Sequence, residues 1–335
     1  MSLLQPMKRI LFLMITIIGS VSLGACEGAI DLETRLDIAV GETDGGNGDG
    51  SNKRGSIGIG VGVGFGNSGP EEDDAILEYE DIIPPEIIKS ANVQGGDCWG
   101  DYFFQFGTNN SRIRVYDLAL KTYVQNVYIY NNQKGFVPNC HCNTVAFGTE
   151  FYDAEDLFPL IYVSTGYGVD GYTGALVYRI TKDYRGSFSV SLVQTIKFPD
   201  MKTSWTEFIP AGEYAYLCYP GERIAYKVEM PKLKDGELVF INPSMALEVY
   251  QFPPRPTWMG SSRNQDNLFY DGKIIFITGV SQGFIGLVVL DLKERKWERI
   301  INFKKNGLTS EPESIFMWQG SICVALSGRI VKLKL

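Results

Sequence analysis

The chain has 335 residues, and 31 Lys and Arg against 39 Asp and Glu give a net charge of −8. An apolar fraction of 44% excludes a wholly disordered chain. The acidic balance, with no cluster of basic residues, excludes nucleic acid as a partner, because that affinity comes largely from neutralised phosphates. His141 is the only histidine, so a multi-histidine metal site is excluded and any Ser or Cys triad would depend on it.

Residues 1–25 have the order of a secretory signal peptide. Lys8 and Arg9 supply a positive region, and residues 10–18 form an apolar stretch shorter than the roughly 20 residues that span a bilayer. The leader ends Leu23-Gly24-Ala25-Cys26, an aliphatic residue and two small residues before a cysteine. This ending resembles the lipobox of bacterial lipoproteins.

The resemblance implies that the leader is cut before Cys26, whose thiol receives a diacylglycerol. Each buried acyl CH₂ contributes about 0.8 kcal/mol, so two or more chains hold a soluble domain at a membrane. Glu27 stands where that family commonly carries Asp for inner-membrane retention, so the resemblance implies a cell-envelope protein at the outer membrane rather than the inner. The alternative is an ordinary cleaved leader with a chance cysteine.

Residues 26–75 are expected to form the acylated N-terminus and a linker. Residues 41–69 hold twelve glycines among Asp, Asn and Ser, which is typical of a flexible tether. Within it, residues 55–66 (GSIGIGVGVGFG) alternate glycine with apolar residues, as a flat strand that contacts a membrane or another copy would. We favour a stalk over such a contact segment.

Residues 76–335 contain short runs rich in Val, Ile, Tyr and Phe, separated by Gly, Asn, Asp and Pro, without sustained helical periodicity. Stacked by register, these runs form five units of about 54 residues, close to the period of kelch propellers. The units start at Asp97, His141, Trp205, Asn264 and Glu311. We therefore predict an all-β fold, a β-propeller of five four-stranded blades.

The fifth unit stops after three strands, at residues 330–335. Residues 76–82 (ILEYEDI) are similar to the fourth strands of other units, so we expect this N-terminal strand to close the last blade. Runs such as IRVYDL and LVVLDL resemble the blades of bacterial lipoprotein and surface propellers. Neither an Asp-box nor a Gly-His…Trp-Asp repeat is present, so the sequence does not support a sialidase-type or WD-type propeller.

In a propeller, the segments leading into the innermost strands converge on one axial mouth, where ligands bind. These segments are polar and carry two tryptophans, a mixture that suits sugars because flat rings cover their apolar face while amides and carboxylates bind hydroxyls. The alternative is that these residues only cap turns and strands. The ligand-binding candidates are Asp97, Trp99, His141, Asn143, Trp205, Asn264, Asp266, Glu311 and Glu313.

Cys140, His141 and Cys142 form a C-H-C triplet, but alternate residues of a strand face opposite sides. We therefore expect the two cysteines to share a face and no zinc to bind; no cofactor is predicted. Besides Cys26, five cysteines remain, an odd number that cannot all pair within one chain. A disulfide between Cys98 and Cys140 or Cys142 is an alternative to free thiols.

The sequence favours a membrane-anchored propeller that binds a glycan or other envelope polymer at its mouth. A protein-interaction scaffold, using outer edges and residues 253–257 (PPRPT), is the second hypothesis. A glycoside hydrolase comes third, because Asp97, Asp266, Glu311 and Glu313 could supply the two carboxyls that such enzymes need. A binding protein is expected rather than an enzyme.

Overall fold

The computed structural model describes residues 76–89, 92–108, 111–130, 140–169, 172–199, 206–219, 223–256, 263–279 and 283–335. The chain divides into units Met1–Asn67 and Ser68–Leu335, and every described residue belongs to the second. The predicted leader, Cys26 and the glycine-rich linker lie outside the described residues, as does Trp205.

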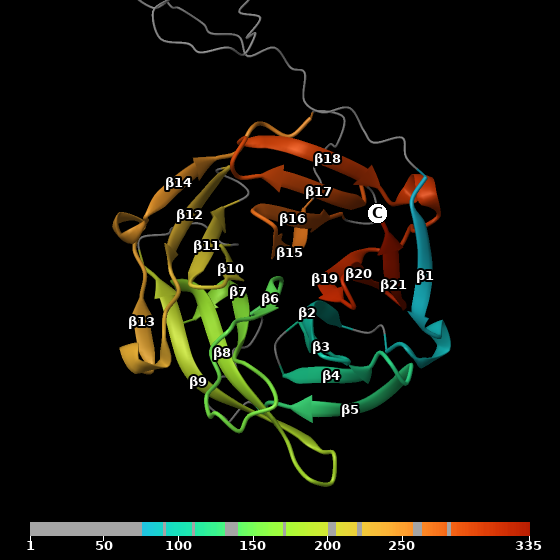
Figure 1. The fold of residues 1–335 in the computed structure, drawn as a ribbon, viewed down its shortest axis with the longest axis horizontal. Coiled ribbons are helices and arrows are strands. Elements are labelled where there is room, and N and C mark those ends of the chain that lie inside the picture. The colour runs from blue at the N-terminus through green and yellow to red at the C-terminus, as the bar shows by residue number, and fades with distance from the viewer. Residues whose placement is uncertain are drawn as a thin grey trace, which may run out of the picture. The chain divides into compact units, whose positions relative to one another are not determined.

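The described residues form five sheets around one axis, each with four antiparallel strands, so the prediction of an all-β, five-bladed propeller is confirmed (Figure 1). In blades 1 to 4, the four strands follow one another in chain order from the axis outwards. In blade 5, β19 is innermost, β20 and β21 follow, and the N-terminal strand β1 is outermost. Blade 1 contains β2 (Val93–Trp99), β3 (Tyr102–Gly107), β4 (Arg112–Asp117) and β5 (Thr122–Tyr128). Blade 2 contains β6 (Val145–Phe147), β7 (Ile161–Val169), β8 (Tyr172–Lys182) and β9 (Phe188–Phe198). Blade 3 contains β10 (Glu207–Ala211), β11 (Tyr214–Tyr219), β12 (Ile224–Glu229) and β14 (Glu248–Gln251). Blade 4 contains β15 (Asn264–Tyr270), β16 (Lys273–Thr278), β17 (Gly286–Asp291) and β18 (Lys296–Asn302). Blade 5 contains β19 (Pro312–Trp318), β20 (Ser321–Leu326), β21 (Arg329–Lys334) and β1 (Glu78–Ile83).

The N-terminal strand closes the ring, as the sequence predicted. β1 pairs antiparallel with β21, from Glu78 opposite Lys334 to Ile83 opposite Ile330, and the two strands lie side by side in Figure 1. β21 therefore has a partner on each side, since β20 pairs with its other edge. Closure removes an unpaired strand edge that would otherwise template association.

Tight hairpins join the first two strands of several blades because the sequence supplies residues that accept positive φ. Asp271 and Gly272 have φ of 48° and 72°, and Gln319 and Gly320 have 49° and 72°. Positive φ at both central residues defines the type I′ turn, whose twist matches that of the flanking strands. The innermost strands β15 and β19 thus return directly into β16 and β20.

Blades 2 and 3 are connected by an additional strand that the sequence analysis did not predict. After β12, the chain forms η2 (Leu233–Asp235) and then β13 (Leu238–Phe240), which pairs parallel with β9 of blade 2. It continues through η3 (Pro243–Met245) and returns to blade 3 as β14. In the part of the chain that the structure describes, the other short helices are η1 (Pro85–Ile87) and η5 (Lys304–Asn306).

The described residues form five hydrophobic core clusters, and each cluster fills the space between two neighbouring blades. At the junction of blades 5 and 1, for example, the rings of Phe103 and Phe316 stack with centroids 4.4 Å apart. At the next junction, Phe104 packs edge-on against Phe158 at 5.3 Å. Burial between faces is why the strands show continuous apolar runs instead of strict alternation.

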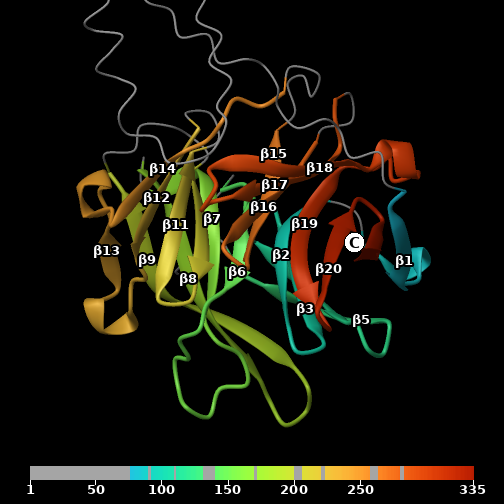
Figure 2. The ribbon, with the colours of Figure 1, turned by 45° about the horizontal axis from the view of Figure 1, so that its top comes forward.

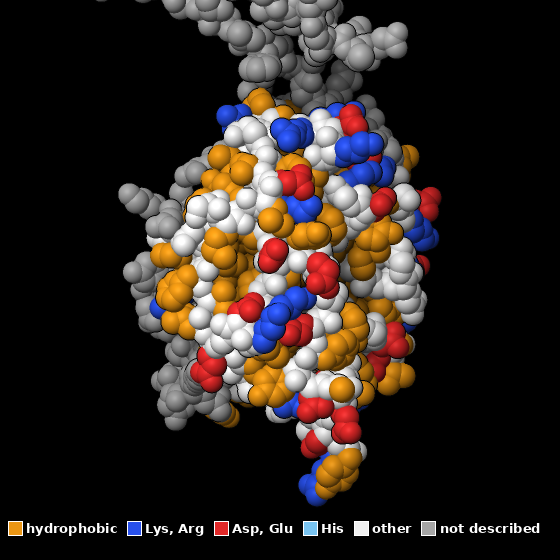
Figure 3. All heavy atoms as spheres, turned by 60° about the vertical axis from the view of Figure 1, so that its left-hand side comes forward, with side chains coloured by type: hydrophobic (Ala, Val, Ile, Leu, Met, Phe, Trp, Pro, Cys, Tyr) orange, Lys and Arg blue, Asp and Glu red, His pale blue; other side chains and the backbone are white. Residues whose placement is uncertain are grey.

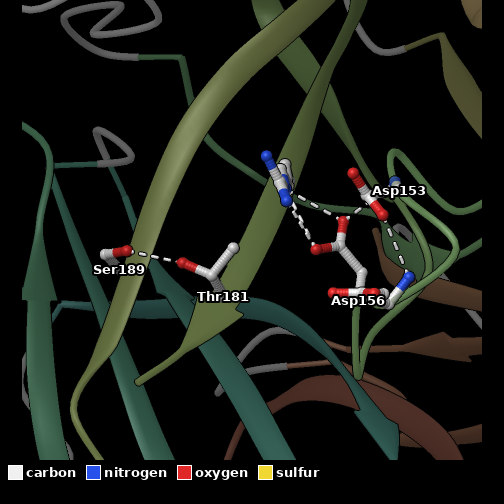
Figure 4. A network of polar contacts seen from close by, with 6 residues as sticks. Asp153, Asp156, Thr181 and Ser189 are labelled. Carbon is white, nitrogen blue, oxygen red and sulfur yellow. Dashed lines mark hydrogen bonds and ion pairs between the residues drawn. The ribbon is translucent and has the colours of Figure 1, made fainter. Parts of the chain in front are cut away.

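Blade 2 carries the longest strands, and the β8–β9 hairpin extends beyond the rest of the blades (Figure 2). Near its base, Asp156 accepts a two-bonded ion pair from Arg179 of β8, with Nη2 to Oδ1 at 2.7 Å. Figure 4 shows this network together with Asp153 and the Thr181–Ser189 hydroxyl pair, 2.7 Å apart. The network fixes the loop before β7 on the outside of blade 2. In the described part of the chain, no helix is long and apolar enough to cross a membrane.

Candidate functional site

The innermost strands β2, β6, β10, β15 and β19 begin at one end of the axis, called here the axial mouth. Contacts between their leading residues show this, since Gly95 donates its N–H to the carbonyl of Cys142 at 2.8 Å, just before β6. Ser314 Oγ donates to the Gln94 carbonyl at 2.9 Å, which joins β19 to β2. These contacts bring together the first residues of blades 1, 2 and 5.

A polar network crosses the axis at this level. Asn267 of β15 donates through Nδ2 to Thr144 Oγ1 at 3.0 Å, which links blade 4 to blade 2. The same asparagine hydrogen-bonds the carboxyl of Glu207 in blade 3. Glu207 also accepts from Asn264 Nδ2 at 3.5 Å, and Arg255 donates to Asn264 Oδ1. The side chains of blades 2, 3 and 4 are thus linked in one hydrogen-bond network around the Glu207 carboxyl.

Glu207 is 2% exposed, and burial raises its pKa to about 7. The hydrogen bonds from Asn267 and Asn264 and the charge of Arg255 act in the opposite direction. The carboxyl therefore titrates near neutral pH. In its protonated form it can both donate and accept a hydrogen bond, which a carboxylate cannot.

A pair of carboxyl groups, Glu311 and Glu313, lies at the start of β19. Glu311 Oε1 accepts from Gln265 Nε2 of blade 4 at 2.6 Å. Burial raises the pKa of Glu311, and burial together with the charge of Glu311 raises that of Glu313 to about 8. The mouth thus holds three carboxyl groups at two places, Glu207 at one and Glu311 with Glu313 at the other, and burial makes each protonate more easily than an exposed carboxyl.

Three buried amide oxygens at the mouth have no hydrogen-bond partner among the described residues. They are Gln94 Oε1 of blade 1, Asn143 Oδ1 before β6, and Asn267 Oδ1 of blade 4. Asn143 and Asn267 are 4% and 1% exposed. A buried acceptor without a donor costs roughly 1–3 kcal/mol, so each of these oxygens has the capacity to accept a further hydrogen bond.

Asp97 and Asp266 hold blades together. Asp97 Oδ2 accepts the N–H of Phe147 in blade 2 at 2.7 Å, and Asp266 Oδ2 accepts that of Ile315 in blade 5 at 3.1 Å. Each also accepts the N–H of the residue that follows it. Burial raises the pKa of Asp97 to about 7 and that of Asp266 well above its usual range. Their carboxyl oxygens are thus engaged by the backbone of neighbouring blades.

Trp99, one of the two tryptophans predicted at the mouth, does not lie there. β2 begins at Val93 rather than near Asp97, so Trp99 is its last residue and lies at the opposite end of the strand. There its ring packs against Phe147 and Phe151, with centroids 5.9 and 6.1 Å away. The sequence pattern placed this strand at residues 95–99, but it counted the last residue of the strand, Trp99, among the residues that lead into it.

His141 is half-buried and has φ of 49°, in the left-handed region that few non-glycine residues adopt. Its N–H donates to the Thr108 carbonyl at 2.7 Å, and burial lowers the pKa of its imidazole. Cys140 and Cys142 share one face, as predicted, with their sulfur atoms 3.0 Å apart. His141 therefore lies in a constrained turn beside Asn143.

Of the predicted candidates, the structure brings Asn143, Asn264, Glu311 and Glu313 together at the mouth. Sequence reasoning missed Glu207, Gln265, Asn267 and Arg255, the last of which stood in the segment assigned to a partner protein. The sequence feature that could have indicated these residues is a run of polar side chains within an innermost strand, as in residues 264–267 (NQDN). Among the described residues, no three His, Cys, Asp or Glu side chains are grouped to hold a metal ion.

Comparisons with known proteins add a likeness of fold. No protein-family model matches the sequence, and no curated protein matches it. Among solved structures, the glutaminyl cyclase of Myxococcus xanthus is similar, with a TM-score of 0.47 and 10% sequence identity over 78% of this chain and 95% of that one.

Proposed function

We propose that this propeller is a binding module for a glycan or another hydroxyl-rich envelope polymer, held at its axial mouth. The observation that carries the proposal is the set of three buried amide oxygens, from Gln94, Asn143 and Asn267, without a donor among the described residues. Sugar hydroxyls are donors and acceptors at once, so they match these oxygens and the protonatable Glu207 beside them.

The test is a glycan array probed with the full-length protein, followed by titration of the glycan that binds. Asn267→Ala and Asn143→Ala are each expected to weaken binding about tenfold, since a hydrogen bond to a buried group contributes roughly 1.4 kcal/mol. Tyr184→Ala is the matched control, because that ring is 89% exposed at the tip of the β8–β9 hairpin. Absence of binding on the array, or equal loss in the control, contradicts the proposal.

The carboxyl groups at the mouth define the hydrolase alternative. Burial gives Glu207 and Glu313 pKa values of about 7 and 8, in the range of a general acid at neutral pH. If the bound glycan is cleaved over time, and Glu207→Gln or Glu313→Gln stops cleavage but not binding, the module is an enzyme. Binding without turnover in the wild type supports the binding module.

A protein-interaction scaffold is favoured by one surface. The segment of β13, η3 and β14 carries five apolar side chains that are each about half exposed: Leu238, Phe240, Met245, Leu247 and Val249. Figure 3 turns this side of the propeller forward, and hydrophobic side chains gather between charged ones. If Leu238→Asp abolishes capture of an envelope protein while glycan binding stays intact, the scaffold role is added to the binding role.

Anchoring is part of the same proposal. We infer that a lipid on Cys26 holds the domain at the outer membrane, on the strength of the Leu-Gly-Ala-Cys ending of the leader. Metabolic labelling with a fatty acid should mark the wild type, and Cys26→Ser should lose the label and leave the membrane fraction. If the Cys26→Ser protein is still labelled, the lipid is not on Cys26. If the wild type fractionates with inner-membrane markers, its predicted location at the outer membrane is wrong.

A further inference from the structure

Cys140 and Cys142 face each other inside the core between blades 1 and 2. Their sulfur atoms are 3.0 Å apart, and neither residue is exposed. A disulfide bond is about 2.05 Å long, so a displacement of about 1 Å would bring the two sulfurs to bonding distance. The residues are separated by His141 alone, so pairing them joins no distant segments of the chain.

The backbone holds this triplet from three sides. Gly166 of β7 donates its N–H to the Cys140 carbonyl at 2.6 Å, and Gly95 of β2 donates to the Cys142 carbonyl at 2.8 Å. His141 donates to Thr108 and has φ of 49°, which turns both cysteine side chains to the same side. The facing thiols are therefore fixed by blades 1 and 2 rather than by flexible side chains.

The remaining described cysteines lie in other clusters of the core. Cys98 and Cys323 belong to the junction of blades 5 and 1, where the Cys98 thiol donates a hydrogen bond to the Gly100 carbonyl at 3.3 Å. Cys218 lies in the cluster between blades 3 and 4. The earlier alternative of a Cys98 bridge to this pair therefore joins two different junctions, whereas Cys140 and Cys142 share one.

We propose that Cys140 and Cys142 form an intrachain disulfide as the domain folds in an oxidising compartment. The oxidant is a disulfide compound, RSSR. One thiolate of the pair attacks a sulfur of RSSR and releases RS⁻; the second thiolate then attacks the mixed disulfide and releases another RS⁻. The two cysteines lose two protons and two electrons, and RSSR is reduced to two RSH. Because the sulfurs are buried in the folded domain, thiol–disulfide exchange takes place before residues 140–142 are packed into the core.

The bond has a consequence for the mouth. Asn143 follows Cys142 directly, and its N–H donates to the His141 carbonyl at 2.6 Å. A covalent link across His141 locks the backbone that presents Asn143. The inference does not depend on which ligand the mouth binds.

The test is peptide mapping of the full-length protein, refolded in a mixture of reduced and oxidised glutathione, alkylated under denaturing conditions and cut with trypsin. The sequence places Cys140 and Cys142 in one tryptic peptide, residues 135–179, whereas Cys98, Cys218 and Cys323 fall singly in three others. We expect peptide 135–179 to be unalkylated and two hydrogen atoms lighter than its reduced form. Peptide 135–179 with two alkyl groups, or joined to another cysteine peptide, overturns the proposal.

Variants give a second readout that does not depend on mass. Reductant should lower the thermal midpoint of the refolded wild type, and Cys140→Ala should show no such decrease. Cys218→Ala is the matched control, since it removes an equally buried thiol from another junction and should keep the decrease. A decrease that persists in Cys140→Ala also overturns the proposal.

Discussion

Asp81 and Arg329 lie 248 residues apart in the sequence and form a two-bonded ion pair across the seam of the ring. Arg329 Nε donates to Asp81 Oδ1 at 2.9 Å and Nη2 to Oδ2 at 2.7 Å. The pair joins β1 to β21, and its hydrogen bond to Asp81 raises the pKa of Arg329. Both side chains are about one-third exposed, so solvent screens much of the attraction.

Asp81→Asn should therefore destabilise the domain only slightly. We expect a loss of up to about 1 kcal/mol in the free energy of unfolding, measured by urea denaturation at low salt. Glu78→Gln is the control, because Glu78 and Lys334 are 3.9 Å apart at the same seam and both largely exposed. A cost for Glu78→Gln equal to that for Asp81→Asn would contradict this prediction.

Apolar burial contributes more to the seam than charge does. Ile83 is fully buried, and Ile83→Ala should cost about 3 kcal/mol in the free energy of unfolding, because it leaves a cavity between blades 5 and 1. Ile76→Ala removes the same side chain from a position that is 87% exposed, and should change stability by less than about 0.5 kcal/mol. Equal effects of the two variants would mean that β1 does not close the ring.

Gly95 is required by close approach between blades. A Cβ on this residue would overlap the Asn143 carbonyl oxygen and lie 2.7 Å from that of Cys142. Gly95→Ala should cost roughly 1–3 kcal/mol and weaken binding at the mouth, because the segment before β6 has to shift. Gly107→Ala, whose Cβ would lie 3.3 Å from the nearest backbone oxygens, should cost less in the same denaturation experiment.

Buried carboxyls should make the protein less stable as the pH rises. Glu313 has a pKa of about 8 in the folded domain against an ordinary value of 4.5, so the folded state binds more protons than the unfolded chain between these values. Glu207, with a pKa of about 7, acts in the same direction. The free energy of unfolding should therefore fall as the pH rises from about 4.5 to 8.

Glu313→Gln should reduce that slope by roughly 1 kcal/mol per pH unit between about pH 5 and 7, as measured by chemical denaturation across the range. The matched control is Glu155→Gln, at an exposed position in the loop before β7, which should leave the slope unchanged. A slope in Glu313→Gln identical to that of the wild type would show that the Glu313 carboxyl is not protonated in the folded domain.

The ring was predictable because its determinants are local. Runs such as residues 287–292 (LVVLDL) indicate strands by their β-branched and apolar content, and Asp271-Gly272 indicates a tight hairpin. Closure was predictable because residues 76–82 are similar to the fourth strands of other blades. The reason for a glycine at position 95 was not predictable, since it is required by contact with Asn143 in another blade.

The site was predictable only in part because its members are selected by neighbours far along the chain. Asn267 contacts Thr144, 123 residues away, and Gln265 contacts Glu311, 46 residues away. Local pattern does not report such pairs. Asp97 and Asp266 carried the right chemistry for a ligand site, but their oxygens accept backbone N–H groups of the next blade.

Because β1 pairs with β21, the last blade closes only after nearly the whole chain has been synthesised. The first strand of the propeller leaves the ribosome some 248 residues before its partner, which at 5–20 residues per second is roughly 10–50 s. During that interval its apolar face, with Ile82 and Ile83, has nothing of its own chain to cover it. Nascent protein halted before residue 329 should therefore be a client of chaperones that shield exposed strands.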